Sequence, residues 1–296
     1  METPNSTCAL CGRKVPLRES HLIPDFVGRW LIETSGTPYL RDAITPNRRR
    51  QRITSVRLLC SKCESDFSRL EQLFARNLFY PYQRHEVPPA RYEEWCLKFI
   101  VSLSWRLLVN VLERLCREDP EWETTLRAFE RQWREFLLDN SSAPGPGAHH
   151  LFFAFPWVFQ ADAPFPDKFF FYIFRGLDGT PVIGADHCYV FSNLCGILIV
   201  SFISPEDPAE WEGTRVLSRG VFPDSQRVSW VPFGPFLFDR SKEVFSQPLS
   251  QAQKEHVRRT IYEHGERYLG SRDFQIYRWE AALRVGEPKL QKNKNP

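Results

Sequence analysis

The chain has 296 residues, of which 42% are hydrophobic and 25% charged, a composition typical of a folded globular protein of about two domain lengths. Its net charge of only +3, from 39 Lys and Arg against 36 Asp and Glu, excludes a uniformly basic nucleic-acid coat. The charge is uneven, because residues 1–91 hold 15 basic and 9 acidic side chains. An excess of this kind at one end favours contact with a polyanion there.

Local patterns predict mostly helices in the first half of the chain. Residues 24–34 place apolar side chains on one helical face, and a second helix is expected from about 65 to 79. Residues 90–139 predict two further helices, separated near Pro120.

Beyond the turn-dense run 141–149, the sequence becomes aromatic and β-rich. Strands are predicted at 151–155, 169–174, 189–191 and 196–203, with a turn at 177–180. Helix is expected again over 251–269 and 274–283.

The most apolar stretch, residues 188–203, is shorter than the ~20 residues of a membrane-spanning helix. Polar residues interrupt it, so two buried strands joined near Asn193 are predicted, and no membrane contact is expected. The N-terminal residues carry no apolar signal-peptide region, which predicts a cytoplasmic, reducing location.

Four of the eight cysteines form two C-x2-C pairs, Cys8 with Cys11 and Cys60 with Cys63. Two such pairs supply four thiolates in tetrahedral geometry, which suits Zn²⁺ and closes its coordination sphere, so that the site is structural. The alternative is two sets of free cysteines. The other four lie singly in apolar stretches, where cysteine behaves as a small buried hydrophobe.

The cysteine pairs occur together with ESHLIP at 19–24 and LLCSKCE at 58–64. This combination resembles the zinc-stapled HNH endonuclease-like modules of bacterial proteins, which have a ββα-metal fold in a treble-clef setting. Those modules show the pattern Cys-x-x-Cys, Ser-His-Ile-Ile-Pro, Leu-Cys-x-x-Cys-Glu. The resemblance covers about residues 8–80 only.

The resemblance implies roles for individual residues. Cys8, Cys11, Cys60 and Cys63 would be structural zinc ligands. His21 would be the general base, a task that suits imidazole because its ordinary pKa is near ~6.5. Glu64 would bind a catalytic Mg²⁺ or Mn²⁺.

The chain also departs from the HNH pattern. Ser20 stands where nuclease members have Asp, and Glu64 stands where they have Asn or His. The nuclease members also carry an Asn shortly before the second cysteine pair, whereas here the nearest is Asn47. Two interpretations stay open, a divergent nuclease or a fold that has kept only its scaffold. Under the second, His21 is a structural hydrogen-bonding residue and Glu64 a helix N-terminal carboxylate.

An arginine cluster lies between the cysteine pairs, at Arg48, Arg49, Arg50, Arg52 and Arg57. Guanidinium groups bind phosphates bidentately, so this segment is predicted to grip a nucleic-acid backbone. The alternative is a solvated loop whose arginines pair with acids elsewhere. The histidines of the C-terminal half follow no metal-binding spacing.

The predicted fold class is therefore α+β, with an HNH-like zinc module at 1–90, a helical connector at 91–140 and a β-rich domain at 150–296 closed by helix. The leading functional hypothesis is a divergent metal-dependent endonuclease that hydrolyses DNA, for which defence against foreign DNA would be a fitting role. The alternatives are a non-catalytic zinc module that binds nucleic acid or protein, and a small-ligand sensor with the aromatic β domain as its pocket.

Overall fold

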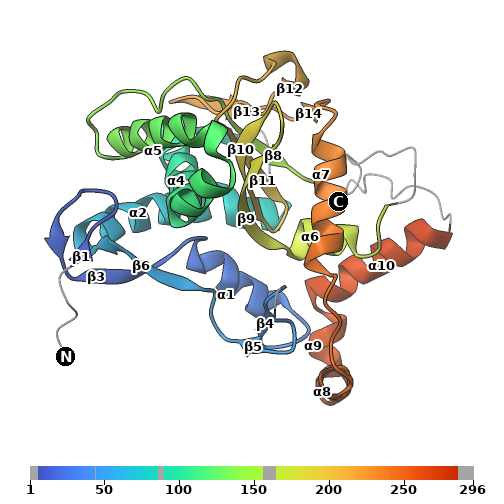
Figure 1. Cartoon of the computed structure of the whole chain (residues 1–296). Coiled ribbons are helices and arrows are strands. Elements are labelled where there is room, and N and C mark those ends of the chain that lie inside the picture. The colour runs from blue at the N-terminus through green and yellow to red at the C-terminus, as the bar shows by residue number, and fades with distance from the viewer. Residues whose placement is uncertain (1–5, 44, 86–89, 156–164, 286–296) are drawn as a thin grey trace.

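The computed structural model describes residues 6–43, 45–85, 90–155 and 165–285, and it has an α+β architecture. A four-stranded antiparallel sheet stands at the centre (Figure 1). Helix α4 (Glu94–Glu118) crosses one face of the sheet, and α6 (Phe169–Arg175) and α7 (Phe233–Val244) cover the other face.

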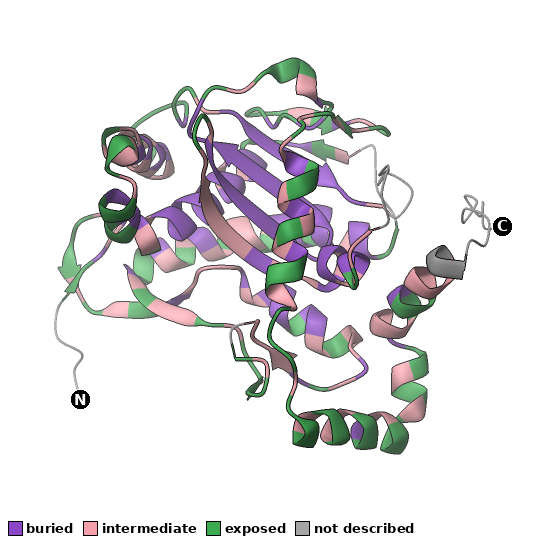
Figure 2. Ribbon diagram, turned by 45° about the vertical axis from the view of Figure 1, so that its right-hand side comes forward, coloured by how far each residue is buried: buried purple, intermediate pink, exposed green. Residues whose placement is uncertain are grey.

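The central sheet has the order β8-β11-β10-β9. Its strands are β8 (His149–Phe153), β9 (Leu177–Ile183), β10 (Cys188–Leu194) and β11 (Ile197–Phe202). Strands β8, β10 and β11 are buried along their whole length, as the purple ribbon in Figure 2 shows, because helices cover both faces.

The prediction of two strands within 188–203 is confirmed. They are joined at Cys195 and Gly196, whose φ angles of 54° and 100° are those of a tight hairpin turn. The Asn193 side-chain oxygen accepts a hydrogen bond from the Gly196 backbone N–H at 3.0 Å, which holds the turn.

The strand predicted at 169–174 is wrong, because this segment is helix α6. An apolar run this short does not distinguish a buried strand from a buried helix. Its first turn is stabilised from far along the chain, since Glu280 Oε1 accepts the backbone N–H of Phe170 at 3.0 Å and of Phe171 at 3.2 Å. No local pattern could reveal that contact.

The turn predicted at 177–180 is also wrong, because these residues belong to strand β9. Gly179 does not form a turn, and its role is to permit close packing. A Cβ at this position would lie 2.7 Å from the Leu107 side chain of α4, which would have to shift, so glycine favours the close approach of the helix to the strand.

The helices predicted in the first half are confirmed with shifted ends. They are α1 (Asp25–Thr34), α2 (Ser61–Phe74), α4 and α5 (Glu123–Leu137). Helix α2 continues through a π-helical turn (Ala75–Phe79) into the short helix α3 (Tyr80–Gln83). Helix α2 begins directly after Cys60, earlier than predicted, which places Cys63 in its first turn.

Within the part of the chain that the structure describes, α4 is the one helix long and apolar enough to cross a membrane. Of its most apolar window, 72% is buried inside the molecule. Its apolar character therefore serves the core, where Trp105 and Phe99 are fully buried.

The predicted C-terminal helices are confirmed as α8 (Gln251–Glu263), α9 (Gly265–Leu269) and α10 (Arg272–Val285). They form an arm that returns to the N-terminal half, where Asp273 accepts a hydrogen bond from Ser35 Oγ at 2.5 Å and pairs with Arg175 at 2.7 Å. Figure 2 shows that most of α8 is exposed.

The remaining strands form short antiparallel pairs. They are β1 (Ser6–Thr7) with β2 (Lys14–Val15), β3 (Leu17–His21) with β6 (Ser55–Cys60), β4 (Leu40–Arg41) with β5 (Arg49–Arg50), β7 (Ala90–Tyr92) with β13 (Gly220–Phe222), and β12 (Trp211–Glu212) with β14 (Arg227–Val228). Short 3-10 turns lie at Pro120–Trp122 and Pro208–Glu210.

One hydrophobic core runs through all three predicted segments. Cys8 and Phe67 of the N-terminal segment, Phe99 of the helical segment, and Val190 and Ile199 of the sheet belong to the same cluster. The N-terminal segment therefore packs directly on the rest of the molecule. Residues 86–89 and 286–296, at the predicted boundaries, lie outside the described residues.

Candidate metal centre and adjoining groove

The four paired cysteines converge on one point, as the sequence predicts. The sulfur atoms of Cys8, Cys11, Cys60 and Cys63 all lie within 4.8 Å of one another. Among the described residues, this is the one group of three or more His, Cys, Asp or Glu side chains that could hold a metal ion.

The spacing of the sulfur atoms fits zinc. Cys11 Sγ and Cys60 Sγ are 3.8 Å apart. A tetrahedral site with Zn–S bonds of about 2.3 Å requires sulfur atoms about 3.8 Å apart. Four thiolates would fill such a site, so it could hold a structural metal ion and would leave no position open for a reacting molecule.

The backbone around the first pair forms a tight loop that presents both sulfur atoms. Gly12 has a φ of 71°, and its N–H donates to the Cys8 carbonyl at 2.9 Å. The loop is joined to the second pair by the Cys60 N–H, which donates to Cys8 Sγ at 3.3 Å. Glycine is favoured at the left-handed position of this turn.

Arg13 lies beside the cluster, 3.3 Å from Cys11 Sγ and 3.7 Å from Cys60 Sγ. Burial acts to raise the pKa of Cys11, but hydrogen bonds from the side chain and backbone of Arg13, together with those to Cys8 and Cys63, outweigh it, and the pKa is lowered to about 6. Arg13 therefore stabilises the thiolate form, which is the form that ligates a metal.

His21 ends strand β3 and is partly exposed. Its Nε2 lies 3.8 Å from Asp25 Oδ1, one helical turn further along in α1. Its backbone carbonyl accepts a hydrogen bond from the buried Arg106 at 2.7 Å, and Arg106 also pairs with Glu71 at 2.8 Å. Glu71 thus anchors the strand end through Arg106.

Glu64 lies on α2, and Ser20 Oγ donates a hydrogen bond to its Oε2 at 2.6 Å. Ser20 is fully buried. Two of the positions at which the chain departs from the HNH pattern, Ser20 and Glu64, are therefore in direct contact. No hydrogen bond or ion pair joins His21 to Glu64 within the described residues.

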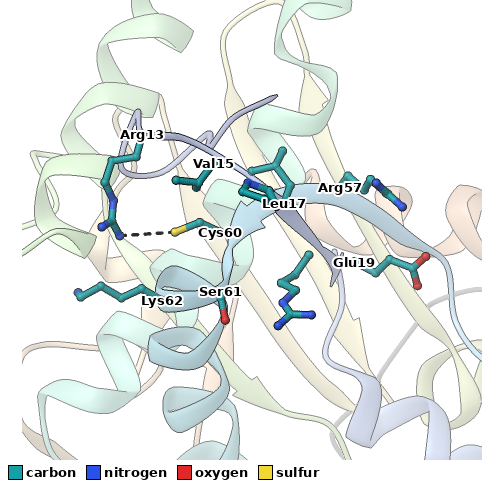
Figure 3. A pocket seen from close by; sticks show the side chains of 10 residues that line it. Arg13, Val15, Leu17, Glu19, Arg57, Cys60, Ser61 and Lys62 are labelled. Carbon is teal, nitrogen blue, oxygen red and sulfur yellow. Dashed lines mark hydrogen bonds between the residues drawn. The ribbon is translucent and has the colours of Figure 1, made fainter. Parts of the chain in front are cut away.

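A groove of about 680 Å³ adjoins the cysteine cluster (Figure 3). It extends from Arg13 and Cys60, across the start of α2 at Ser61, to Glu19 and Arg57. Ten residues line it: Arg13, Val15, Pro16, Leu17, Arg18, Glu19, Arg57, Cys60, Ser61 and Lys62. Four of these side chains are basic and one is acidic.

A second hollow continues the groove toward Glu64. Its lining consists of Arg18, Glu19, Ser61, Glu64 and Ser65, of which the first three also line the groove. The carboxylates of Glu19 and Glu64 therefore open onto the same surface as the basic side chains.

The five arginines predicted to bind nucleic acid lie in two places. Arg57 is on β6 in the groove. The other four lie in β5 and close on either side of it, where Arg50 pairs with Asp42 at 3.2 Å and Arg49 contacts His256 of α8 at 2.7 Å.

Neighbouring residues of the arginine segment also contact α8. Arg41 Nη2 donates to Gln253 Oε1 at 3.0 Å, and the Asn47 side-chain oxygen accepts the Ser250 N–H at 2.7 Å. Part of the arginine segment is therefore docked on the C-terminal arm.

Arg13, Arg18 and Lys62 were not among the residues predicted to bind a partner. A signal for Arg18 was present, because it alternates with apolar Leu17 along a strand and is therefore exposed. No sequence pattern indicated a role for Arg106 at the site, because it lies within an apolar helical run that predicts only a buried core helix.

The histidines of the C-terminal half form no metal site in the described residues. His149 and His150 are buried on β8, and their Nδ1 atoms contact the hydroxyls of Ser201 at 2.8 Å and Thr214 at 2.9 Å. Burial lowers the pKa of both to about 3, so both are neutral. The surrounding aromatic rings, including Trp211, pack against one another as core.

No protein-family model matches the sequence, and no match was found among curated proteins or solved structures. The function therefore has to be inferred from the geometry and charge of the site.

Proposed function

We propose that this protein is a zinc-stapled nucleic-acid-binding protein of the HNH-like, treble-clef kind. The groove beside the cysteine centre would receive the phosphate backbone. The observation that carries the proposal is the charge of the groove, which is lined by Arg13, Arg18, Arg57 and Lys62 and by a single carboxylate, Glu19.

Two further features support an anionic ligand in the groove. Arg18 and Arg57 form no ion pair within the described residues, so their guanidinium groups are available for bidentate contacts with phosphate. Helix α2 begins in the groove at Ser61, and the N-terminus of a helix carries a partial positive charge. Binding of this kind would be independent of sequence and sensitive to salt.

The double variant Arg18→Gln/Arg57→Gln is expected to bind DNA and RNA more weakly than wild type. Two lost phosphate contacts, at about 0.9 each, should reduce the slope of log affinity against log salt by about 1.8. Fluorescence anisotropy with a labelled DNA duplex and a labelled RNA of equal length would measure both affinity and slope.

The matched control is Arg117→Gln/Arg131→Gln, which removes the same charge from exposed positions on α4 and α5. It should bind as wild type does. Equal weakening by the two double variants would show that only net charge matters and would contradict the groove as the binding site.

Hydrolysis is a second candidate function, favoured by the two carboxylates beside the groove. Glu64 and Glu19 would hold Mg²⁺ or Mn²⁺, since hard oxygen donors suit these ions. When bound, the ion would stabilise charge on the oxygens of a phosphodiester. His21 would accept a proton from water, with Asp25 orienting its ring.

A supercoiled plasmid offered with Mg²⁺ or Mn²⁺ would test this candidate. His21→Ala and Glu64→Gln are each expected to lower the cleavage rate by about 10²–10⁴-fold, while Glu121→Gln, an exposed carboxylate on the 3-10 turn after α4, should leave it unchanged. No cleavage by the zinc-loaded wild type with either metal would rule out the nuclease and leave the binding proposal standing.

A further inference from the structure

A second basic surface lies where the β4–β5 hairpin meets α8. Ser250, which caps α8, donates its N–H to Asn47, and His256 in the second turn contacts Arg49. The rings of Tyr39 and His256 stack with their centroids 5.9 Å apart. These contacts bring together segments about two hundred residues apart in the chain.

The two docked segments, called here together the hairpin–α8 surface, carry six exposed basic side chains, of which those of α8 lie away from its docked face with Gln253 and His256. They are Arg48, Arg49 and Arg52 from the hairpin segment and Lys254, Arg258 and Arg259 from α8. Apart from Arg49, none of the six has an ion pair or side-chain hydrogen bond within the described residues.

Several basic side chains of the α4–α5 surface have carboxylate partners. Arg127 binds both Glu113 and Glu123, and Arg114 binds Glu118. Cations with intramolecular partners are neutralised, whereas the six cations of the hairpin–α8 surface outnumber the exposed Glu255 and Glu263 of α8 and leave a net positive charge for a partner.

The composition of the surface favours nucleic acid over an acidic protein. Five of its six cations are arginines, which bind phosphate with two parallel hydrogen bonds. Tyr262 is 90% exposed and lies three and four residues after Arg259 and Arg258, on the same side of α8. An exposed ring beside arginines is a stacking platform for an unpaired base.

We propose that the hairpin–α8 surface is a second nucleic-acid contact, in which the arginines bind the phosphate backbone and Tyr262 stacks on an unpaired base. The inference rests on the proposed function, because it extends the footprint of the same ligand beyond the groove. It also gives the C-terminal arm a direct part in binding.

The test uses the full-length, zinc-loaded protein and labelled single-stranded and duplex DNA. Arg258→Gln/Arg259→Gln is expected to reduce the slope of log affinity against log salt by about 1.8. Between about 50 and 200 mM salt, the variant should therefore lose about twelvefold less affinity than wild type loses. Tyr262→Ala should lower the affinity for the single strand by about tenfold and leave the affinity for the duplex unchanged.

The groove variant Arg18→Gln/Arg57→Gln and the control Arg117→Gln/Arg131→Gln are measured beside them. If the groove variant weakens binding while Arg258→Gln/Arg259→Gln behaves like the control, this inference is overturned and the proposed function stands. If wild type binds neither DNA nor RNA, the proposed function falls as well. Competition by polyglutamate as effective as that by a nucleic acid of equal charge would assign the surface to an acidic protein instead.

Discussion

Removal of zinc is expected to unfold the N-terminal 80 residues. Structural zinc bound by cysteines contributes an apparent free energy of about 10–16 kcal/mol, as large as the whole stability of a typical domain. Helices α1 and α2 also pack into the shared core, but β1, β2, β3 and β6 form only two-stranded pairs, and the two cysteine loops are joined by their sulfur atoms and few backbone hydrogen bonds, so the metal is expected to dominate the stability of this segment.

Limited proteolysis and circular dichroism, before and after chelation, would measure this unfolding. Cys8→Ser and Cys63→Ser should have the effect of the chelator, and Cys116→Ser, a buried cysteine outside the cluster, should not. Unchanged helicity and protease resistance after complete removal of zinc would contradict the assignment of the cluster as a structural centre.

Arg106→Met is expected to lower the free energy of unfolding by about 3–5 kcal/mol. The Arg106 side chain is only 1% exposed and binds both Glu71 and the His21 carbonyl. The substitution leaves a half-buried carboxylate without its partner and a strand end without its donor. It should therefore also loosen the position of His21.

Urea unfolding of the single and double variants would separate the charge effect from packing. Arg106→Met/Glu71→Leu removes both charges together and should restore most of the lost stability, because replacing a whole buried pair by apolar groups is nearly neutral. A double variant as unstable as the single one would show that Arg106 acts through packing on Phe67, whose ring it covers at 5.3 Å, and not through Glu71.

The sequence predicted those features that depend on local pattern. Apolar periodicity located α1, α4 and α5, and a continuous apolar run with a glycine located β10 and β11. The cysteine cluster was predictable because two cysteines that bind one metal ion are often separated by two residues, as they are in both pairs.

Features that depend on tertiary contact could not be predicted. Helix α6 depends on Glu280, and strand β9 accommodates Gly179 because α4 crosses it closely. The groove combines the first cysteine loop, two strands and the start of α2, and α8 docks on a hairpin that no local pattern places near it. The arginine segment was expected to act as one unit, whereas the fold divides its side chains between two surfaces.

Hydrogen–deuterium exchange of the zinc-loaded protein, with and without a saturating DNA duplex, tests the central claim most directly. If the groove receives the phosphate backbone, protection should be strongest in peptides that cover residues 13–19 and 57–65. Protection that leaves both peptides unchanged, in a sample where the duplex is bound, would contradict the groove as the nucleic-acid interface.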